Sequence, residues 1–194
     1  MEGNVKYHGY HSTTEENALE ILSSGFCLPK MDIDGSEKID DRFFKYWLGS
    51  GIYFYEDEGV AKWWSSKPSK TFGSVGSHII LKSEICPKKV FDLRKVASWN
   101  QLIKFFDEFM KIIGKKVVVE DVDNKNREYN IRCIFFNWLQ SSIQCDMIIA
   151  AFNQNEFAYL AKGEYSIGEE MDLYYTEVQY CVYDASIISN TKKF

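Results

Sequence analysis

Two aromatic residues that follow a glycine-rich segment are the first candidates for a binding site. Tyr53 lies in an apolar tract that begins directly after Gly49-Ser50-Gly51, and Trp64 follows eleven residues later. If Tyr53 lies on a strand and Trp64 on the helix behind it, the two rings can hold a flat heterocycle, with stacking worth roughly 0.5–1.5 kcal/mol per pair. Aromatic clusters are also typical of a packed core, so this stretch alone leaves both interpretations open.

A carboxylate and an amide near the end of the sequence are the second candidates. Glu177 and Gln179 are two residues apart in a segment that favours a strand. They should therefore share one strand face, roughly 6.5–7 Å apart along the strand. Such a pair can reach one sugar together, and it is equally typical of a solvent-facing polar strand.

A histidine at the end of an aromatic segment is the third candidate. His11 follows the predicted strand 5–10 and precedes a predicted helix, and such junctions often contact ligands. His8 lies three residues earlier, so the two imidazoles should point to opposite faces and only His11 is expected in the site. His78, at the start of a later strand, is expected at the surface.

The elements that must position these residues are strands with helices between them. Strands are predicted at 5–10, 51–55, 78–85, 145–152 and 172–184, and helices from the N-cap Thr13 to Gly25, after Asp57, and at 98–113 and 132–140. The strands 78–85 and 145–152 do not alternate, which fits a sheet covered on both faces. The segment 27–47 is predicted to be a long loop, either a binding loop or a surface excursion.

The composition indicates one domain over residues 1–194. A hydrophobic fraction of 45% is ample for a core, and a net charge of −5 argues against a broad basic surface for nucleic acid. No apolar run approaches the ~18 residues of a membrane span and no signal peptide opens the chain, so a cytoplasmic protein without a membrane partner is expected. Five scattered cysteines and three histidines predict reduced thiols and no metal site.

Together these segments resemble the ADP-ribosyltransferase superfamily, on the side of diphtheria toxin and poly(ADP-ribose) polymerase. The matching motifs are Tyr10-His11-Ser12-Thr13 with a helix ending in Gly25-Phe26, then Gly49-Ser50-Gly51-Ile52-Tyr53-Phe54 with Ala61 and Trp64, then the tract from Gln179 to Asp184. They cover roughly a third of the chain, and residues 86–171 carry no motif of the family.

The resemblance has one departure, at Gln179. Polymerase-type members keep a catalytic glutamate there, whereas a glutamine can bond a ribose hydroxyl but carries no charge. Chain-elongating activity is therefore not expected, and Glu177 offers a carboxylate on the same face. Arginine-type members also use two polar residues at this spacing, in the order Gln/Glu-x-Glu, which is reversed here.

The resemblance implies an α+β fold with two antiparallel sheets forming a split core, flanking helices and a central cleft for NAD. It implies that His11 bonds the adenine-side ribose and the backbone of Ser12 the nicotinamide carboxamide. Tyr53 and Trp64 would enclose the nicotinamide ring, with Trp63 as a substitute. Gln179 would bond the 2′-hydroxyl, and Glu177 would stabilise positive charge or deprotonate the acceptor. The other residues expected around NAD are Tyr10, Thr13, Gly51 and Ala61.

The expected function is that of a mono-ADP-ribosyltransferase, an enzyme that uses NAD as co-substrate and needs no metal. The acceptor would be a protein or a nucleic acid. Small enzymes of this type often resemble toxins or phage-defence effectors, so an antitoxin or immunity protein is an expected partner. The alternatives are an NAD glycohydrolase, a phosphotransferase of the RNA 2′-phosphate type, and a non-catalytic module that binds NAD or ADP-ribose.

Overall fold

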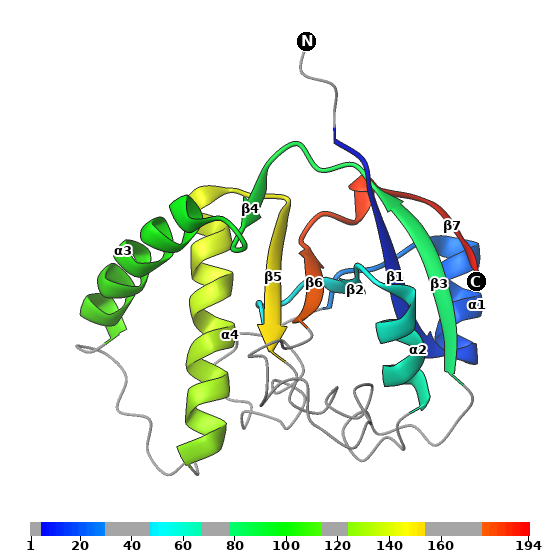
Figure 1. Cartoon of the computed structure of the whole chain (residues 1–194), viewed down its shortest axis with the longest axis horizontal. Coiled ribbons are helices and arrows are strands. Elements are labelled where there is room, and N and C mark those ends of the chain that lie inside the picture. Colours follow the sequence, from blue (N-terminus) through cyan, green and yellow to red (C-terminus); the bar gives the residue numbers. More distant parts are fainter. Residues whose placement is uncertain (1–4, 30–46, 67–77, 114–123, 154–175) are drawn as a thin grey trace, which may run out of the picture.

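The computed structural model describes residues 5–29, 47–66, 78–113, 124–153 and 176–194, which form an α+β unit (Figure 1). The strands are β1 (Tyr7–Thr14), β2 (Ile52–Tyr55), β3 (His78–Ile85), β4 (Val90–Asp92), β5 (Met147–Asn153), β6 (Thr176–Val182) and β7 (Ile188–Lys193). The helices are α1 (Glu15–Ser24), α2 (Glu58–Ser66), α3 (Val96–Ile113) and α4 (Asn124–Ile143), with a 3-10 turn, η3 (Ala185–Ile187). None of these described helices has the length and apolar character that a membrane crossing requires.

Within the described residues, the strands form one mixed sheet of seven strands rather than the two antiparallel sheets expected. The order is β4-β5-β6-β2-β1-β3-β7, and every neighbouring pair is antiparallel except β4 and β5. The two halves of the sheet meet at β1 and β2 through the single residue pair Tyr10 and Tyr55. Beyond that pair, the Tyr53 carbonyl is hydrogen-bonded by Nδ1 of His11 at 2.8 Å instead of by the backbone of β1. The expected pair of sheets is therefore absent from the described residues, where β1 and β2 diverge beyond Tyr10 and Tyr55 inside one sheet.

Helices cover both faces of the sheet. One face of the sheet carries Glu177, Gln179 and Cys181. At the β4–β5 end, α3 and α4 cover this face, and buried side chains of both helices pack with Cys181. Near β1, α2 covers the same face. The opposite face buries Ile52, Phe54 and their neighbours, against which Phe26 packs directly after α1. In Figure 1, α3 and α4 lie at one end of the sheet and α1 and α2 at the other, on either side of β1 and β3.

Most element boundaries depart from the prediction by a few residues. The strand β3 has the predicted bounds, and Gly25, with φ of 85°, ends α1 as predicted. The N-cap is Thr14 rather than Thr13, because it is the Thr14 hydroxyl that accepts the hydrogen bond from the Asn17 amide. The helix α4 begins at Asn124 rather than at 132, and the polar edge strand β7 was not predicted. Residues 30–46 of the expected loop and 172–175 of the last predicted strand lie outside the described residues.

Candidate functional site

A cavity of about 580 Å³ lies where β1 and β2 diverge. This volume is within the range of roughly 300–1,000 Å³ that small-molecule sites occupy. Its wall includes most of the residues that the sequence singled out, namely His11, Ser12, Thr13, Gly51, Tyr53, Trp64 and Gln179. They come from β1, from β2 and the turn before it, from α2 and from β6, so the sheet topology brings together segments more than a hundred residues apart.

Four predicted site residues do not line this cavity. The Tyr10 ring packs edge-on against Phe194 at 5.3 Å, on the strand face opposite to that of His11. Ala61 is fully buried in α2, and the Trp63 ring packs edge-on against Trp64 at 4.9 Å. Glu177, the fourth, lies behind the wall and contacts two residues of it.

His11 is held as a neutral ring in the cavity wall. Its ring centroid lies 5.2 Å from that of Phe26 and 5.7 Å from that of Phe54. Burial lowers the pKa of the imidazole below its ordinary value of 6.5, an effect that the Tyr53 carbonyl offsets only in part. The neutral ring donates its Nδ1–H to that carbonyl, which leaves Nε2 as a hydrogen-bond acceptor.

Tyr53 is anchored to the glycine-rich turn in front of its own strand. Its hydroxyl accepts a hydrogen bond from the Leu48 amide at 2.7 Å and donates one to the Gly49 carbonyl at 2.8 Å. Gly49 has φ of 93°, a conformation that favours glycine, and a β-carbon at Gly51 would lie 2.5 Å from Sγ of Cys181. Gly49 thus allows the backbone of the turn, Gly51 lets it approach β6 closely, and this turn fixes the Tyr53 ring.

A carboxylate, an amide and an indole form a network between β6 and α2. Glu177 is fully buried, and its Oε2 accepts a hydrogen bond from Nε1–H of Trp64 at 2.9 Å. Its Oε1 accepts a hydrogen bond from the side-chain amide of Gln179. Gln179 is 8% exposed and lines the cavity, opposite Tyr55 of β2 in register. Burial, together with the charge of Glu177, raises the pKa of Tyr55.

The cavity also includes residues that the sequence did not mark. Trp47 lies in its wall, with its ring 4.9 Å from that of Phe152 and below the guanidinium of Arg132. His78 lines the cavity although a surface position was expected, because β3 pairs with β1 so that His78 lies opposite Thr14. The position of His78 depends on strand register, which cannot be read from the sequence around it. Trp47 could have been predicted as a site residue, because it lies next to the glycine-rich turn.

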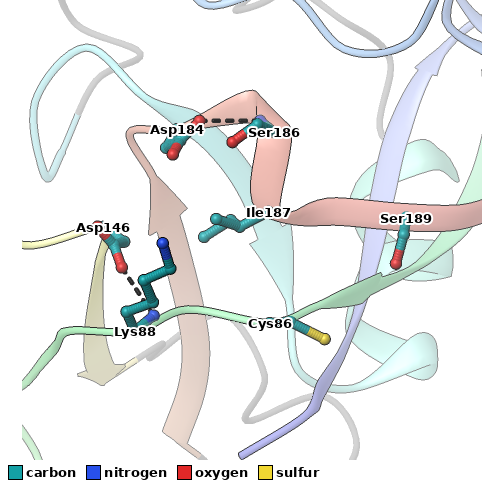
Figure 2. A pocket seen from close by; sticks show the side chains of 7 residues that line it. All are labelled: Cys86, Lys88, Asp146, Asp184, Ser186, Ile187 and Ser189. Atoms are coloured by element: carbon teal, nitrogen blue, oxygen red, sulfur yellow. Dashed lines mark hydrogen bonds between the residues drawn. The ribbon is translucent and has the colours of Figure 1, made fainter. Parts of the chain in front are cut away.

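A second, smaller pocket of about 340 Å³ lies among the turns that follow β3 and β6 (Figure 2). Oδ2 of Asp146 accepts hydrogen bonds from the backbone amides of Lys88 and Lys89, at 2.7 and 2.9 Å. Oδ1 of Asp184 accepts one from the Ser186 amide at 2.9 Å. These carboxylates serve the backbone of the turns. Among the described residues, no group of three or more histidine, cysteine, aspartate or glutamate side chains is placed to hold a metal ion.

Comparisons with known proteins identify neither a family nor a fold for this chain. No family model matches it, and no solved structure matches it. It is similar to an uncharacterized protein of Methanocaldococcus jannaschii, with 34% identity over 117 residues. The match covers 59% of this chain and 48% of the relative, so the chain spans about half the length of the curated relative it matches. The function must therefore be inferred from the residues and the geometry of the site.

Proposed function

We propose that the protein is a mono-ADP-ribosyltransferase, which cleaves NAD between nicotinamide and ribose and transfers ADP-ribose to a protein or a nucleic acid. One observation carries the proposal: His11, Tyr53, Trp64 and Gln179, from four separate elements, line one cavity. His11, Tyr53 and Trp64 match the family motifs in order and type, and Gln179 stands where the family keeps a glutamate. The tertiary structure brings the four residues together.

The cavity wall fits the nicotinamide half of NAD in size and chemistry. Tyr53 and Trp64 supply apolar ring surface for a flat heterocycle, and the Tyr53 ring is held in place by its two hydrogen bonds to the turn. Gln179 supplies hydrogen-bonding atoms for a hydroxyl of the nicotinamide ribose, and the neutral His11 supplies an acceptor toward the adenine-side ribose. Small-molecule sites typically combine such a largely apolar wall with a few fixed polar groups.

In the proposed reaction, the bond between C1′ of the ribose and the nicotinamide nitrogen breaks, and its electron pair leaves with nicotinamide. The acceptor attacks C1′ and loses a proton. Positive charge develops on the ribose, as in glycoside cleavage. The Glu177 carboxylate contacts Gln179 directly, so its negative charge lies next to the cavity without entering it. Positioning and electrostatics would supply most of the rate enhancement.

The proposal is tested by incubating the purified protein with NAD labelled in its ADP-ribose part, with and without cell lysate. We expect label on protein or on nucleic acid, and its loss in the Gln179→Ala variant. Free labelled ADP-ribose without transfer would instead indicate a glycohydrolase. Slow growth on expression of the wild type, but not of Gln179→Ala, would link the activity to a toxin role and to an antitoxin or immunity partner.

A non-catalytic module that binds NAD or ADP-ribose is the second candidate. The observation that favours it is the burial of Glu177: the carboxylate that contacts Gln179 does not itself line the cavity. A carboxylate that never reaches the ribose or the acceptor can neither contact the oxocarbenium centre directly nor take the acceptor's proton. Tight binding of NAD without any release of nicotinamide, in the presence of lysate, would establish this alternative.

A further inference from the structure

The side-chain amide of Gln179 has a fixed orientation in the cavity wall. Its Nε2–H donates to Oε1 of Glu177, while the Trp64 indole donates to the other carboxylate oxygen. A carboxylate with a donor on each oxygen is satisfied in its ionised form, and an ionised carboxylate can only accept. The end of the Gln179 amide that faces Glu177 must therefore be its NH₂ group.

The other end of the same amide remains for a ligand. Among the described residues, Oε1 of Gln179 makes no hydrogen bond, and Gln179 lines the cavity. A glutamine in solvent can rotate its amide and present either a donor or an acceptor. Rotation here would place Oε1 against the buried Glu177 carboxylate and lose a charge-assisted hydrogen bond, which is costly at a buried site.

We infer that Glu177 is a positioning residue that holds the Gln179 amide with its carbonyl oxygen toward the cavity, so that the site selects a ligand group that donates a hydrogen bond. The inference rests on the proposed function, in which that group is the 2′-hydroxyl of the nicotinamide ribose. Glu177 then acts through Gln179, and the glutamine offers a fixed acceptor without placing a second carboxylate beside the first.

Two NAD analogues test the orientation directly. A hydroxyl can donate to the Gln179 carbonyl oxygen, whereas fluorine at the same carbon can only accept and would face that oxygen unfavourably. Wild type should bind NAD at least about tenfold more tightly than its 2′-fluoro analogue, because sites built around a hydrogen bond discriminate strongly against a mismatched group. The 2′-deoxy analogue, which has neither atom, should lie between them.

Variants of the wall test whether the preference for NAD over its 2′-fluoro analogue depends on the contact between Glu177 and Gln179. Glu177→Gln frees the amide to rotate, so the ratio of the two dissociation constants should fall to within about threefold. Trp64→Phe is the matched control: it keeps a ring in the wall and leaves the carboxylate against the amide, so affinity changes while the ratio stays. Gln179→Ala should abolish the preference. If Glu177→Gln does not fold, Glu177→Asp takes its place, because the shorter side chain withdraws the carboxylate from the amide and the same fall is expected.

The outcomes separate this inference from the proposed function. Binding of NAD by the folded wild type, with no preference over the fluoro analogue or with an unchanged ratio in the Glu177 variant, overturns the inference alone. Failure of the folded wild type to bind NAD overturns the proposed function and this inference with it. A ratio that collapses only in the Glu177 and Gln179 variants supports the inference whether the protein turns NAD over or merely binds it.

Discussion

The cavity and the smaller pocket, two hollows in the part of the chain that the structure describes, contain similar polar residues but use them differently. In the smaller pocket, the carboxylates of Asp146 and Asp184 accept hydrogen bonds from backbone amides of neighbouring turns (Figure 2). In the cavity at the sheet divergence, Glu177 instead accepts from two side chains, Trp64 and Gln179, and both of these line the wall. A carboxylate that caps a turn stabilises the fold, whereas one that orients wall residues determines what the wall offers a ligand.

A pocket becomes a candidate site through the hydrogen-bonding groups that it leaves available to a ligand. Asp146 uses one oxygen for two backbone amides and so serves to hold the turn that joins β3 to β4. His11 and Gln179 each donate one hydrogen bond to the protein, from Nδ1 and from Nε2. Each side chain keeps a hydrogen-bond acceptor at its other end, Nε2 of His11 and Oε1 of Gln179. Substitutions in the smaller pocket should therefore change the free energy of unfolding, whereas substitutions in the cavity wall should change the affinity for the ligand.

The largest expected effect is on turnover in Glu177→Gln. The variant loses the negative charge of Glu177 next to the ribose and the fixed orientation of the Gln179 amide. The rate of NAD cleavage should therefore fall by about 10²-fold, which is in the range for one charge-stabilising group. Affinity for NAD itself should change by much less, since the rings of Tyr53 and Trp64 are untouched. The release of nicotinamide measures the first quantity, and calorimetry the second.

The matched control for this effect lies in the smaller pocket. Asp184→Asn also replaces a carboxylate by its amide, at a residue that caps η3. Its turnover should equal that of the wild type. An equal loss of turnover in both variants would mean that the two hollows are not functionally distinct.

The second effect is on affinity, in Tyr53→Ala. Removal of the ring should weaken NAD binding by on the order of 1–3 kcal/mol, because both stacking and apolar contact are lost. Tyr53→Phe keeps the ring but loses the hydrogen bonds to Leu48 and Gly49. It should lower stability by about 1 kcal/mol while NAD affinity stays within a few-fold. An unchanged dissociation constant in a folded Tyr53→Ala protein would exclude the ring from the site.

The sequence predicted the local chemistry of the cavity better than its overall construction. The alternation of β2 and β6 placed Tyr53 in line with Tyr55, and Glu177 in line with Gln179, because a strand has a fixed period of two. The contribution of Trp47 and His78 was missed, since it depends on pairing between distant strands and on chain segments without periodicity. The burial of Glu177 was equally invisible, because it follows from the packing of Trp64 of α2 over β6.

The third effect is on stability, in Asp146→Ala. The substitution leaves the backbone amides of Lys88 and Lys89 without their acceptor, which should cost about 1–2 kcal/mol in the free energy of unfolding. NAD affinity should not change, because the pocket of Asp146 shares no lining residue with the cavity. Urea denaturation measures the free energy of unfolding, and calorimetry on the same preparation measures the NAD affinity. A loss of affinity without a loss of stability would show that the smaller pocket, not the cavity alone, takes part in binding.

The smallest effect is the pH dependence of stability that His11 contributes. Because burial lowers its pKa in the folded protein, the unfolded chain takes up a proton at a higher pH than the folded chain does. Stability is therefore fully present above the ordinary value of 6.5 and declines as the pH falls from there toward the folded pKa.

His11→Asn keeps a donor for the Tyr53 carbonyl but cannot be protonated, so between pH 5 and about 6.5 its unfolding free energy should fall less steeply than that of the wild type, by up to roughly 1 kcal/mol. Denaturation series at several pH values measure these slopes, and a His11→Asn slope equal to that of the wild type would show that the ring is not held neutral in the cavity wall.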